Sequence, residues 1–251
     1  RYLLAELQRE GIDCSHVAVD PAQRTGLQFK GRVVDGSDPP VEYHRKGSAA
    51  SRMGVDDVDA DWLRSARHLH ATGVFPALSQ STLDAARRSL EIMRAAGGSI
   101  TFDPNLRPSL WSSPEHMRET INGLALQADC VLPGLDEGRL LTGERAPEAI
   151  AAFYRAAGVP SVVVKLGAAG AYYDDAVEGR GFVPGFPVAE VVDTVGAGDG
   201  FAVGVISARL EGLGLADAVR RGCWIGARAV QVPGDTEGLP TRAELQAAGI
   251  A

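Results

Sequence analysis

The sequence has few cysteines, few aromatic side chains and no long apolar run. Its three cysteines, Cys14, Cys130 and Cys223, lie far apart and form no Cys-x-x-Cys pair. This pattern argues against a disulfide framework and a zinc site, and it favours the cytoplasm. Although 45% of the residues are hydrophobic, no stretch approaches the roughly 18 apolar residues that span a bilayer. A membrane-spanning or disulfide-stapled protein is therefore excluded, and no membrane partner is expected.

Basic residues are outnumbered as well. The chain has 25 lysine and arginine residues against 32 aspartate and glutamate residues, which gives a net charge of −7. Proteins that hold nucleic acid through phosphate contacts need a basic surface, so no nucleic-acid partner is expected. The sequence contains no Gly-Lys dipeptide, which excludes a Walker A phosphate loop. Any anionic substrate must be caught by a local site.

Glycine, in contrast, is abundant, with 30 of the 251 residues. This is about 12%, against a usual share of about 7%. Such a surplus indicates many tight turns, or backbone that approaches a ligand closely.

The first 50 residues predict two small elements. Leu3, Leu4 and Leu7 have helical spacing in a segment that ends at Gly11, and no initiating methionine precedes them. We therefore expect an N-terminal segment to be missing from this sequence. Strand-like runs at 25–34 and 41–46 are separated by a cluster of turn-forming residues at 35–40, which predicts a small antiparallel sheet.

Strands and helices alternate from about residue 56 onward. The expected strands are 69–74, 99–103, 129–132 and 161–166, and the expected helices are 80–96, 114–127 and 147–157. Such alternation implies right-handed crossovers and a mostly parallel sheet with helices on both faces. Ligands in such folds bind beyond the carboxyl ends of the strands.

The stretch DTVGAGDG at 193–200 is the strongest candidate site. We predict a strand at 190–192 and a helix at 201–210, so the amides of Gly196, Ala197 and Gly198 would point at one anion at a helix N-terminus. Asp199 follows in the first turn, where it could accept a proton from a substrate hydroxyl while these amides stabilise a phosphoryl group. The alternative is an ordinary glycine-rich turn, because short glycine motifs occur often by chance.

The string Asp193-Thr194-Val195-Gly196-Ala197-Gly198-Asp199 resembles the Asp-Thr-x-Gly-Ala-Gly-Asp signature of the ribokinase-like, or PfkB, carbohydrate kinases. The resemblance extends along the whole chain, apart from the family's opening strand and its sugar loop. It implies an α/β fold, a ribokinase-like three-layer sandwich with a mostly parallel central sheet and a small β-sheet lid. Residues 1–13 and 51–251 would form the kinase domain, and 14–50 the lid.

The same resemblance assigns roles to the motif. Asp199 would be the general base that deprotonates the sugar hydroxyl. Gly196, Ala197 and Gly198 would form the anion hole for the transferred phosphoryl group. A monovalent cation near Asp193 is left open.

Two further runs are similar to the family's nucleotide side. Lys165-Leu166-Gly167-Ala168-Ala169-Gly170 follows a predicted strand and resembles the nucleotide loop, which implies ATP; a plain hairpin turn is the alternative. Glu137 matches the glutamate of the family's Asn-x-x-Glu motif, which helps to arrange Mg²⁺, although Gly134 replaces the asparagine. Mg²⁺ commonly uses one or two carboxylates. The alternative for Glu137 is an acid that simply favours a helix start.

The substrate side looks like the 2-keto-3-deoxygluconate kinases within this family. The resemblance lies in Tyr43-His44-Arg45 and in the run at 103–108. A sugar acid carries a carboxylate, which arginine can hold in a bidentate pair. Arg45 and Arg107 are therefore the candidate ligands.

Three further groups complete the expected sugar site: the hydroxyl of Tyr43, the catalytic Asp199 and, by resemblance, the late acid Asp235. Arg107 could instead reach the ATP phosphates. Tyr43 and Arg45 could be ordinary residues of an exposed strand.

We therefore expect ATP-dependent phosphorylation of 2-keto-3-deoxygluconate to its 6-phosphate. Fructokinase or another sugar kinase of the family stays open, as does a truncated, catalytically silent nucleotide-binding module. A homo-oligomer through the exposed edges of the lid strands is expected. His68 and His70 share a strand face, but no third ligand has suitable spacing, so no metal site is predicted there.

Overall fold

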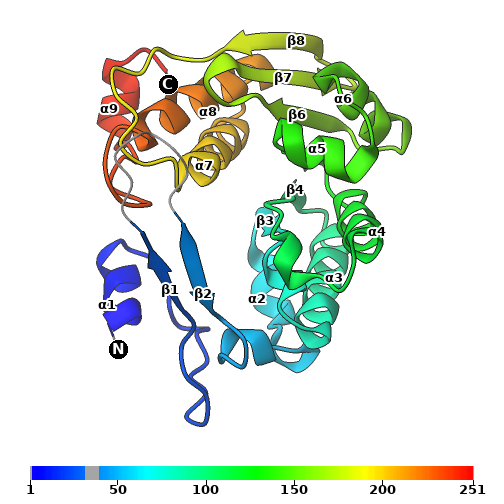
Figure 1. Ribbon diagram of the computed structural model, residues 1–251, viewed down its shortest axis with the longest axis vertical. Helices are drawn as coiled ribbons and strands as arrows, with labels where there is room; N and C mark the ends of the chain where they lie inside the picture. The colour runs from blue at the N-terminus through cyan, green and yellow to red at the C-terminus, as the bar shows by residue number, and fades with distance from the viewer. Residues whose placement is uncertain (1, 32–39, 251) are drawn as a thin grey trace.

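The computed structural model describes residues 2–31 and 40–250 (Figure 1). The α-helices are α1 (Tyr2–Arg9), α2 (Ala60–Ser65), α3 (Gln80–Ala95), α4 (Pro114–Ala125), α5 (Leu135–Thr142), α6 (Pro147–Ala156), α7 (Ala197–Leu210), α8 (Leu215–Ala229) and α9 (Arg242–Ala247). The strands are β1 (Leu27–Lys30), β2 (Val41–His44), β3 (His68–Thr72), β4 (Ser99–Asp103), β5 (Cys130–Val131), β6 (Ser161–Lys165), β7 (Gly170–Asp175) and β8 (Gly179–Pro184). The predicted alternation of strands and helices after residue 56 is confirmed, with ends that shift by a few residues.

The main sheet has the strand order β3-β4-β5-β6-β7-β8. The pairs from β3 to β6 are parallel, and β7 and β8 are added antiparallel. The strand at 99–103 is found as predicted, and the strand at 129–132 shortens to two residues. Because the parallel strands run in one direction, their carboxyl ends open at one edge of the sheet.

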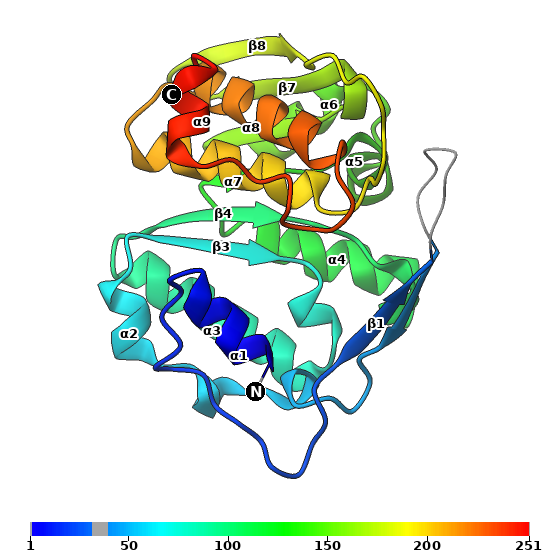
Figure 2. The same ribbon diagram turned by 90° about the vertical axis from the view of Figure 1, so that its left-hand side faces the viewer.

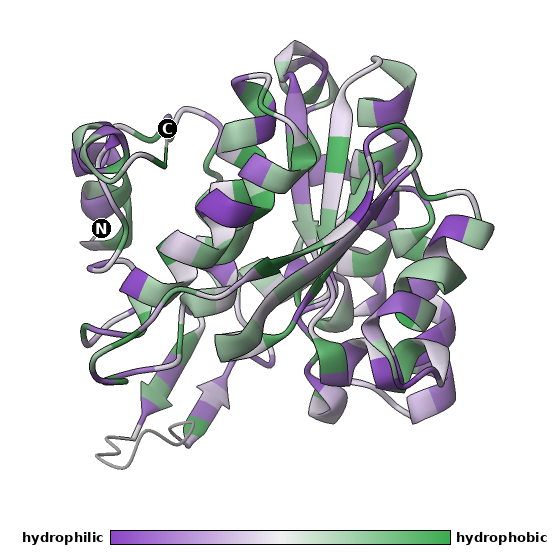
Figure 3. Cartoon of the chain, turned by 90° about the horizontal axis from the view of Figure 1, so that it is seen from above, coloured by the Kyte–Doolittle hydropathy of each residue, from purple (hydrophilic) through white to green (hydrophobic). Residues whose placement is uncertain are grey.

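Helices cover both faces of this sheet, which confirms the three-layer sandwich (Figure 2). Val162 and Val164 of β6 pack into a core shared with α3, α4, α5 and α6. Val163, between them, faces the opposite core, which α7 and α8 form with β8. This alternation of buried valines follows from the two-residue period of a strand that is covered on both sides. Figure 3 shows the complementary pattern in the helices, which carry both hydrophilic and hydrophobic segments.

Helix ends follow the expected capping chemistry. Ser113 accepts the amide of His116 at 3.1 Å, with Pro114 in the first helical position of α4. Gly97 ends α3 with a φ of +74°. The expected N-terminal helix is also present as α1, and Gly11 follows it with a φ of +76°.

Strands β1 and β2 form a separate antiparallel sheet, as predicted from the two strand-like runs (Figure 1). Its register pairs Leu27 with His44 and Lys30 with Val41. The amide of Gly31 continues the ladder to the carbonyl of Pro40 at 2.8 Å. The end of the first run, at 32–34, and all but the last residue of the predicted turn at 35–40 lie outside the described residues.

The predicted strand at 190–192 is wrong. The amides of Val192 and Asp193 both donate to the carbonyl of Val230, just past the end of α8, at 2.7 and 3.2 Å. One carbonyl, rather than a neighbouring strand, anchors the segment, and Val191 and Val192 stay 41% and 37% exposed. The following helix begins at Ala197, four residues before the predicted start.

No helix in residues 2–31 and 40–250 is both long and apolar enough to cross a membrane.

Candidate active site

A cavity of about 720 Å³ opens beyond the carboxyl ends of β5 and β6 and beside the N-terminus of α7. Most of the residues predicted for the nucleotide side line it. They are Lys165, Leu166, Gly167, Ala168, Gly170, Ala197, Gly198 and Glu137. Ala169, Gly196 and Asp199 do not line it. The size and position are suited to a ligand such as a nucleotide.

The predicted anion hole is the N-terminus of α7. Gly196 is the N-cap, with a φ of +84°, and a Cβ on it would lie 2.6 Å from the carbonyl oxygen of Asp235. Only glycine meets both conditions. The first bond of the helix runs from the amide of Gly200 to the carbonyl of Gly196 at 2.8 Å. Of the predicted amides, that of Ala197 makes a long bond of 3.4 Å to the carbonyl of Thr194. Within the described residues, no backbone acceptor takes the amides of Gly196, Gly198 and Asp199, so these three are available to an anion.

Asp199 is exposed in the first turn of α7. Its carboxylate is neither packed among apolar side chains nor engaged in an ion pair with any residue that the structure describes. It can therefore approach a bound hydroxyl group, as a general base must.

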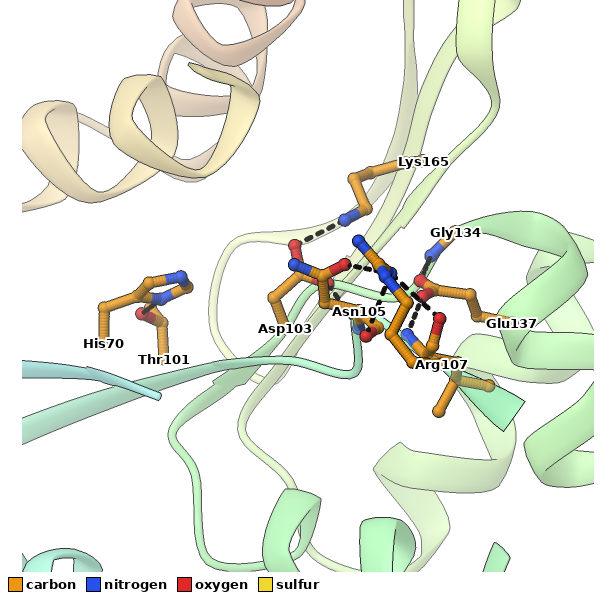
Figure 4. A network of polar contacts seen from close by, with 9 residues as sticks. His70, Thr101, Asp103, Asn105, Arg107, Gly134, Glu137 and Lys165 are labelled. Carbon is orange, nitrogen blue, oxygen red and sulfur yellow. Dashed lines mark hydrogen bonds and ion pairs between the residues drawn. The ribbon is translucent and has the colours of Figure 1, made fainter. Parts of the chain in front are cut away.

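Lys165 connects two parts of the site (Figure 4). Its ammonium donates to Asp103 Oδ2 at 2.5 Å, and a Cβ on Gly198 would lie 3.8 Å from the same nitrogen. Asp103 is buried at the end of β4. Burial raises the pKa of this carboxyl group, and the charge of Lys165 opposes the rise. Lys165 thus holds a positive charge between the end of β4 and the start of α7.

The run at 165–170 is also the hairpin that was the alternative interpretation. It joins β6 to the antiparallel β7 through a short turn at Gly167–Ala169. The two interpretations are compatible, because this turn lines the cavity.

Glu137 braces the loops around the cavity. One carboxylate oxygen accepts the amide of Gly134 at 2.8 Å, and the other accepts the amide of Leu106 at 2.7 Å (Figure 4). The first bond is the helix-start contact considered above for an acid in this position. A carboxylate has about four acceptor positions, so each oxygen of this cavity-lining residue retains one.

Arg107 and Arg45 belong to a second, neighbouring cluster. Arg107 donates to Asn105 Oδ1 at 2.7 Å and to the carbonyl of Leu106 at 2.9 Å. Arg45 lies over the ring of Tyr43, 4.0 Å from its centroid, and donates to Gln28 Oε1 at 3.1 Å. The guanidinium of Arg45 is therefore held by side chains of the small sheet that β1 and β2 form.

The two guanidinium groups repel each other. Burial lowers the pKa of Arg45, the Tyr43 hydroxyl opposes this, and the positive charge of Arg107 lowers it further. Within the described residues, no carboxylate pairs with either arginine. The cluster is thus a positively charged site without an acidic partner among residues 2–31 and 40–250.

Asp235 does not join the two arginines. Its carboxylate accepts the ammonium of Lys30 at 2.8 Å, and Asp193 accepts the same ammonium at 2.7 Å. The sequence left open whether a monovalent cation binds near Asp193. In the structure the ammonium of Lys30 lies beside this carboxylate.

Three polar side chains of the site were not predicted from the sequence: Lys30, Asp103 and His70. Asp103 had a usable signal, since it ends the strand β4 and is the first residue of the quoted run at 103–108. His70 bonds through Nδ1 to Thr101 Oγ1 at 2.7 Å. Burial, with the nearby charges of His68 and Lys165, lowers the pKa of His70 to about 4. In the described part of the chain, no group of three or more His, Cys, Asp or Glu residues could hold a metal ion.

Comparison with known proteins places the chain in a class. Residues 1–242 match the model of the pfkB family carbohydrate kinases. The chain belongs to this family and is a sugar kinase of the PfkB type, as its glycine motif predicted.

Three individual proteins are similar to this chain over nearly its whole length. The 2-dehydro-3-deoxygluconokinase of Bacillus subtilis (strain 168) is 50% identical over 245 residues, which are 97% of this chain and 75% of that protein. The crystal structure of a PfkB protein from Polaromonas sp. JS666 is 66% identical with a TM-score of 0.89, over 98% of this chain and 79% of the other. A putative ribokinase II from E. coli, in complex with ATP and Mg²⁺, is 31% identical with a TM-score of 0.87, over 97% and 77% of the two chains.

Proposed function

We propose that this protein transfers the γ-phosphoryl group of ATP to the 6-hydroxyl of 2-dehydro-3-deoxygluconate, the same compound as 2-keto-3-deoxygluconate. The observation that carries the substrate is the pair Arg45 and Arg107, two cations without a carboxylate partner among the described residues. A substrate carboxylate could pair with both and would offset part of their charge. The similarity to the Bacillus subtilis enzyme supports the same substrate.

The proposed mechanism uses the geometry at α7. Asp199 accepts the proton of the 6-hydroxyl as its oxygen forms a bond to the γ-phosphorus, and the bond from that phosphorus to ADP breaks. The amides at Gly196–Gly198 and the ammonium of Lys165 stabilise the charge on the transferred group. Tyr43 and Asp235 would complete the sugar side.

Mg²⁺ fits the acidic rim of the cavity. Glu137 lines the cavity and keeps an acceptor position on each oxygen, so it would hold the ion directly or through water. The ion would neutralise phosphate charge in the transition state. The carboxylate of Asp193 already accepts the ammonium of Lys30. A monovalent cation near Asp193 stays a prediction, and a titration of turnover with potassium tests it.

The lid at 14–50 would close over the sugar and exclude water, since an open site would hydrolyse ATP. Two copies would associate through the lid strands, where Leu27 and Phe29 are 57% and 62% exposed. Light scattering measures the mass of the particle in solution and so tests this association. The cytoplasm is the proposed location, because all three cysteines are free thiols.

The substrate is tested with an ADP-release assay of the full-length protein on sugar acids and neutral sugars. We expect 2-dehydro-3-deoxygluconate to give the highest kcat/KM. Equal or better turnover of fructose would overturn the substrate and favour a fructokinase. Calorimetry with sugar and nucleotide separately detects a silent module, which would bind ATP without any turnover.

The mechanism is tested with Asp199→Asn. This variant should lose activity by about three orders of magnitude or more while it retains ATP binding. Asp217→Asn is the matched control, because Asp217 is an exposed acid in the first turn of the neighbouring helix α8. Near-normal turnover of Asp199→Asn would refute the mechanism.

A further inference from the structure

Among the ion pairs of the described residues, those of Lys30 connect the lid strands to the α/β domain. Lys30 ends β1, and its side chain reaches away from the lid to Asp193 Oδ2 at 2.7 Å and to Asp235 Oδ1 at 2.8 Å. Figure 1 shows this end of the lid directed toward α7. The other ion pair of the described lid strands, between His44 and Glu42, stays within β2. One ammonium therefore joins two parts of the molecule that are 163 residues apart in sequence.

Both carboxylates belong to the loops that shape the anion hole. Asp193 Oδ1 accepts the amide of Val195 at 3.0 Å, and Oδ2 accepts that of Gly234 at 3.4 Å. Asp193 thus sets the turn that leads into Gly196. The loop of Asp235 packs directly on this turn, because its carbonyl oxygen would lie 2.6 Å from a Cβ on Gly196.

The ammonium removes a repulsion between these two loops. Two carboxylates that approach one nitrogen within 2.8 Å lie close to each other, and without the cation they would repel. The Lys30 side chain is 24% exposed and that of Asp193 only 11%, so solvent screens this pair incompletely. Asp235, whose side chain is 47% exposed, is screened more strongly. Withdrawal of Lys30 would let the loops of Asp193 and Asp235 separate, and the amides at Gly196–Gly198 would lose their alignment.

The same strand pair carries the sugar-side residues. Gln28 lies two residues before Lys30 in β1 and pairs with Tyr43 of β2. Arg45 donates a hydrogen bond to the side chain of Gln28. A lid position that brings Arg45 toward Arg107 therefore also brings Lys30 to Asp193. Sugar capture and assembly of the anion hole are two consequences of one lid position.

We propose that Lys30 is a positioning residue that couples the lid to the anion hole, so that the amides at Gly196–Gly198 are aligned for phosphoryl transfer only when the lid lies over the sugar. The proposal rests on the proposed function for its kinetic effect, but its structural effect is independent of the substrate. Lys30 does not touch the reacting atoms; it acts through Asp193 and Asp235.

The test compares Lys30→Met with Lys30→Arg and with Lys46→Met, in which an exposed lysine of the same lid loses the same charge. Hydrogen exchange is measured first on the protein without ligands. We expect Lys30→Met to speed exchange at least tenfold at the amides of Asp193 and Val195, which are hydrogen-bonded in this turn. Lys46→Met should leave this exchange unchanged, and Lys30→Arg should restore most of the protection. Wild-type exchange in Lys30→Met, or the same acceleration in Lys46→Met, would overturn the proposal.

Kinetics supply the second measurement, with whichever sugar proves to be the substrate. Lys30→Met should lower kcat at least tenfold and leave KM for ATP within twofold of wild type, because most of the residues that line the nucleotide cavity lie outside the segment 193–199. A rise in KM for ATP with unchanged kcat would contradict the coupling. If 2-dehydro-3-deoxygluconate proves not to be a substrate, the exchange measurement still decides the role of Lys30.

Discussion

Arg45 and Arg107 are the clearest residue-scale sign of what this protein binds. Like charges at close range raise the free energy of a folded protein unless an anion joins them. Neither guanidinium has an acidic partner in the part of the chain that the structure describes, and each is held by neutral oxygens instead. The site can thus take an anion that the described part of the chain does not supply.

Loss of either arginine should weaken the sugar acid selectively. A charge-assisted hydrogen bond contributes about 1.5–3 kcal/mol, so Arg45→Gln and Arg107→Gln should each raise KM for the sugar acid about tenfold to a hundredfold. KM for ATP should stay near wild type. Steady-state kinetics with each substrate varied in turn measure both constants.

Arg24→Gln is the control, since Arg24 is an exposed arginine before β1 and outside the cluster. An increase in KM for ATP in Arg107→Gln, with the sugar constant unchanged, would show that Arg107 faces the phosphates. Unchanged sugar constants in both variants would remove the carboxylate site.

Residues differ in how well the sequence predicts them. The anion-hole residues and Asp199 are contiguous, so one short string contains both the bend and the acid. No short motif predicts the role of Lys30, because its partners lie 163 and 205 residues away and only the folded chain brings them together. The pairing of Lys165 with Asp103 is hidden for the same reason, although each residue directly follows or ends a predicted strand.

At the scale of elements, strands that are buried on both faces are the easiest to predict. The valines of β6 are apolar without interruption, and the strand lies where expected. The segment 190–192 also contains valines, but among the described residues no strand lies beside it, and the amides of Val192 and Asp193 use the carbonyl of Val230 instead. The composition of a segment indicates its preference for an extended conformation. Whether it forms a strand depends on whether the fold places another strand beside it.

The start of α7 permits a matched test with two glycines. Gly196→Ala would place a Cβ 2.6 Å from Asp235 O on a backbone with φ of +84°. A left-handed residue with a Cβ costs roughly 1–2 kcal/mol before any steric contact, so Tm should fall by at least about 3 °C. Activity should fall more than tenfold, because the amides of the anion hole move with this residue.

Gly198→Ala is the control for stability. Its Cβ would meet only Lys165 Nζ, at 3.8 Å, and its backbone is helical, so Tm should hold or rise. Differential scanning calorimetry of the two variants gives the comparison. Equal stability of both variants would show that the turn can relax around Gly196.

At the scale of the whole molecule, the candidate reaction site lies where three parts meet: the lid, the carboxyl edge of the parallel sheet and the start of α7. The sequence predicted the sheet and the turn from their periodicity and motif, and it predicted the lid as a separate small sheet. Their mutual position depends on a few long-range contacts, including Lys30 with Asp193 and the loop of Asp103 with β6. Periodicity carries no information on such contacts.

The buried network along β3 and β4 should make the stability of the whole protein sensitive to acid. Burial lowers the pKa of His70 from 6.5 to about 4, and the charges of His68 and Lys165 lower it as well. Between these two values the unfolded chain binds a proton at His70 that the folded chain does not. The free energy of unfolding is therefore complete above pH 6.5 and falls as the pH decreases toward 4, by up to about 3 kcal/mol from this residue.

His70→Asn isolates this contribution, because an asparagine amide can still bond to Thr101 without titrating. Urea unfolding at several values between pH 4 and pH 7 should give a slope against pH that is shallower in His70→Asn than in the wild type. His116→Asn, at an exposed histidine of α4, should retain the wild-type slope. The effect has this sign because the folded state excludes the proton; a wild-type slope in His70→Asn would mean that His70 titrates in the folded protein as it does in the unfolded chain.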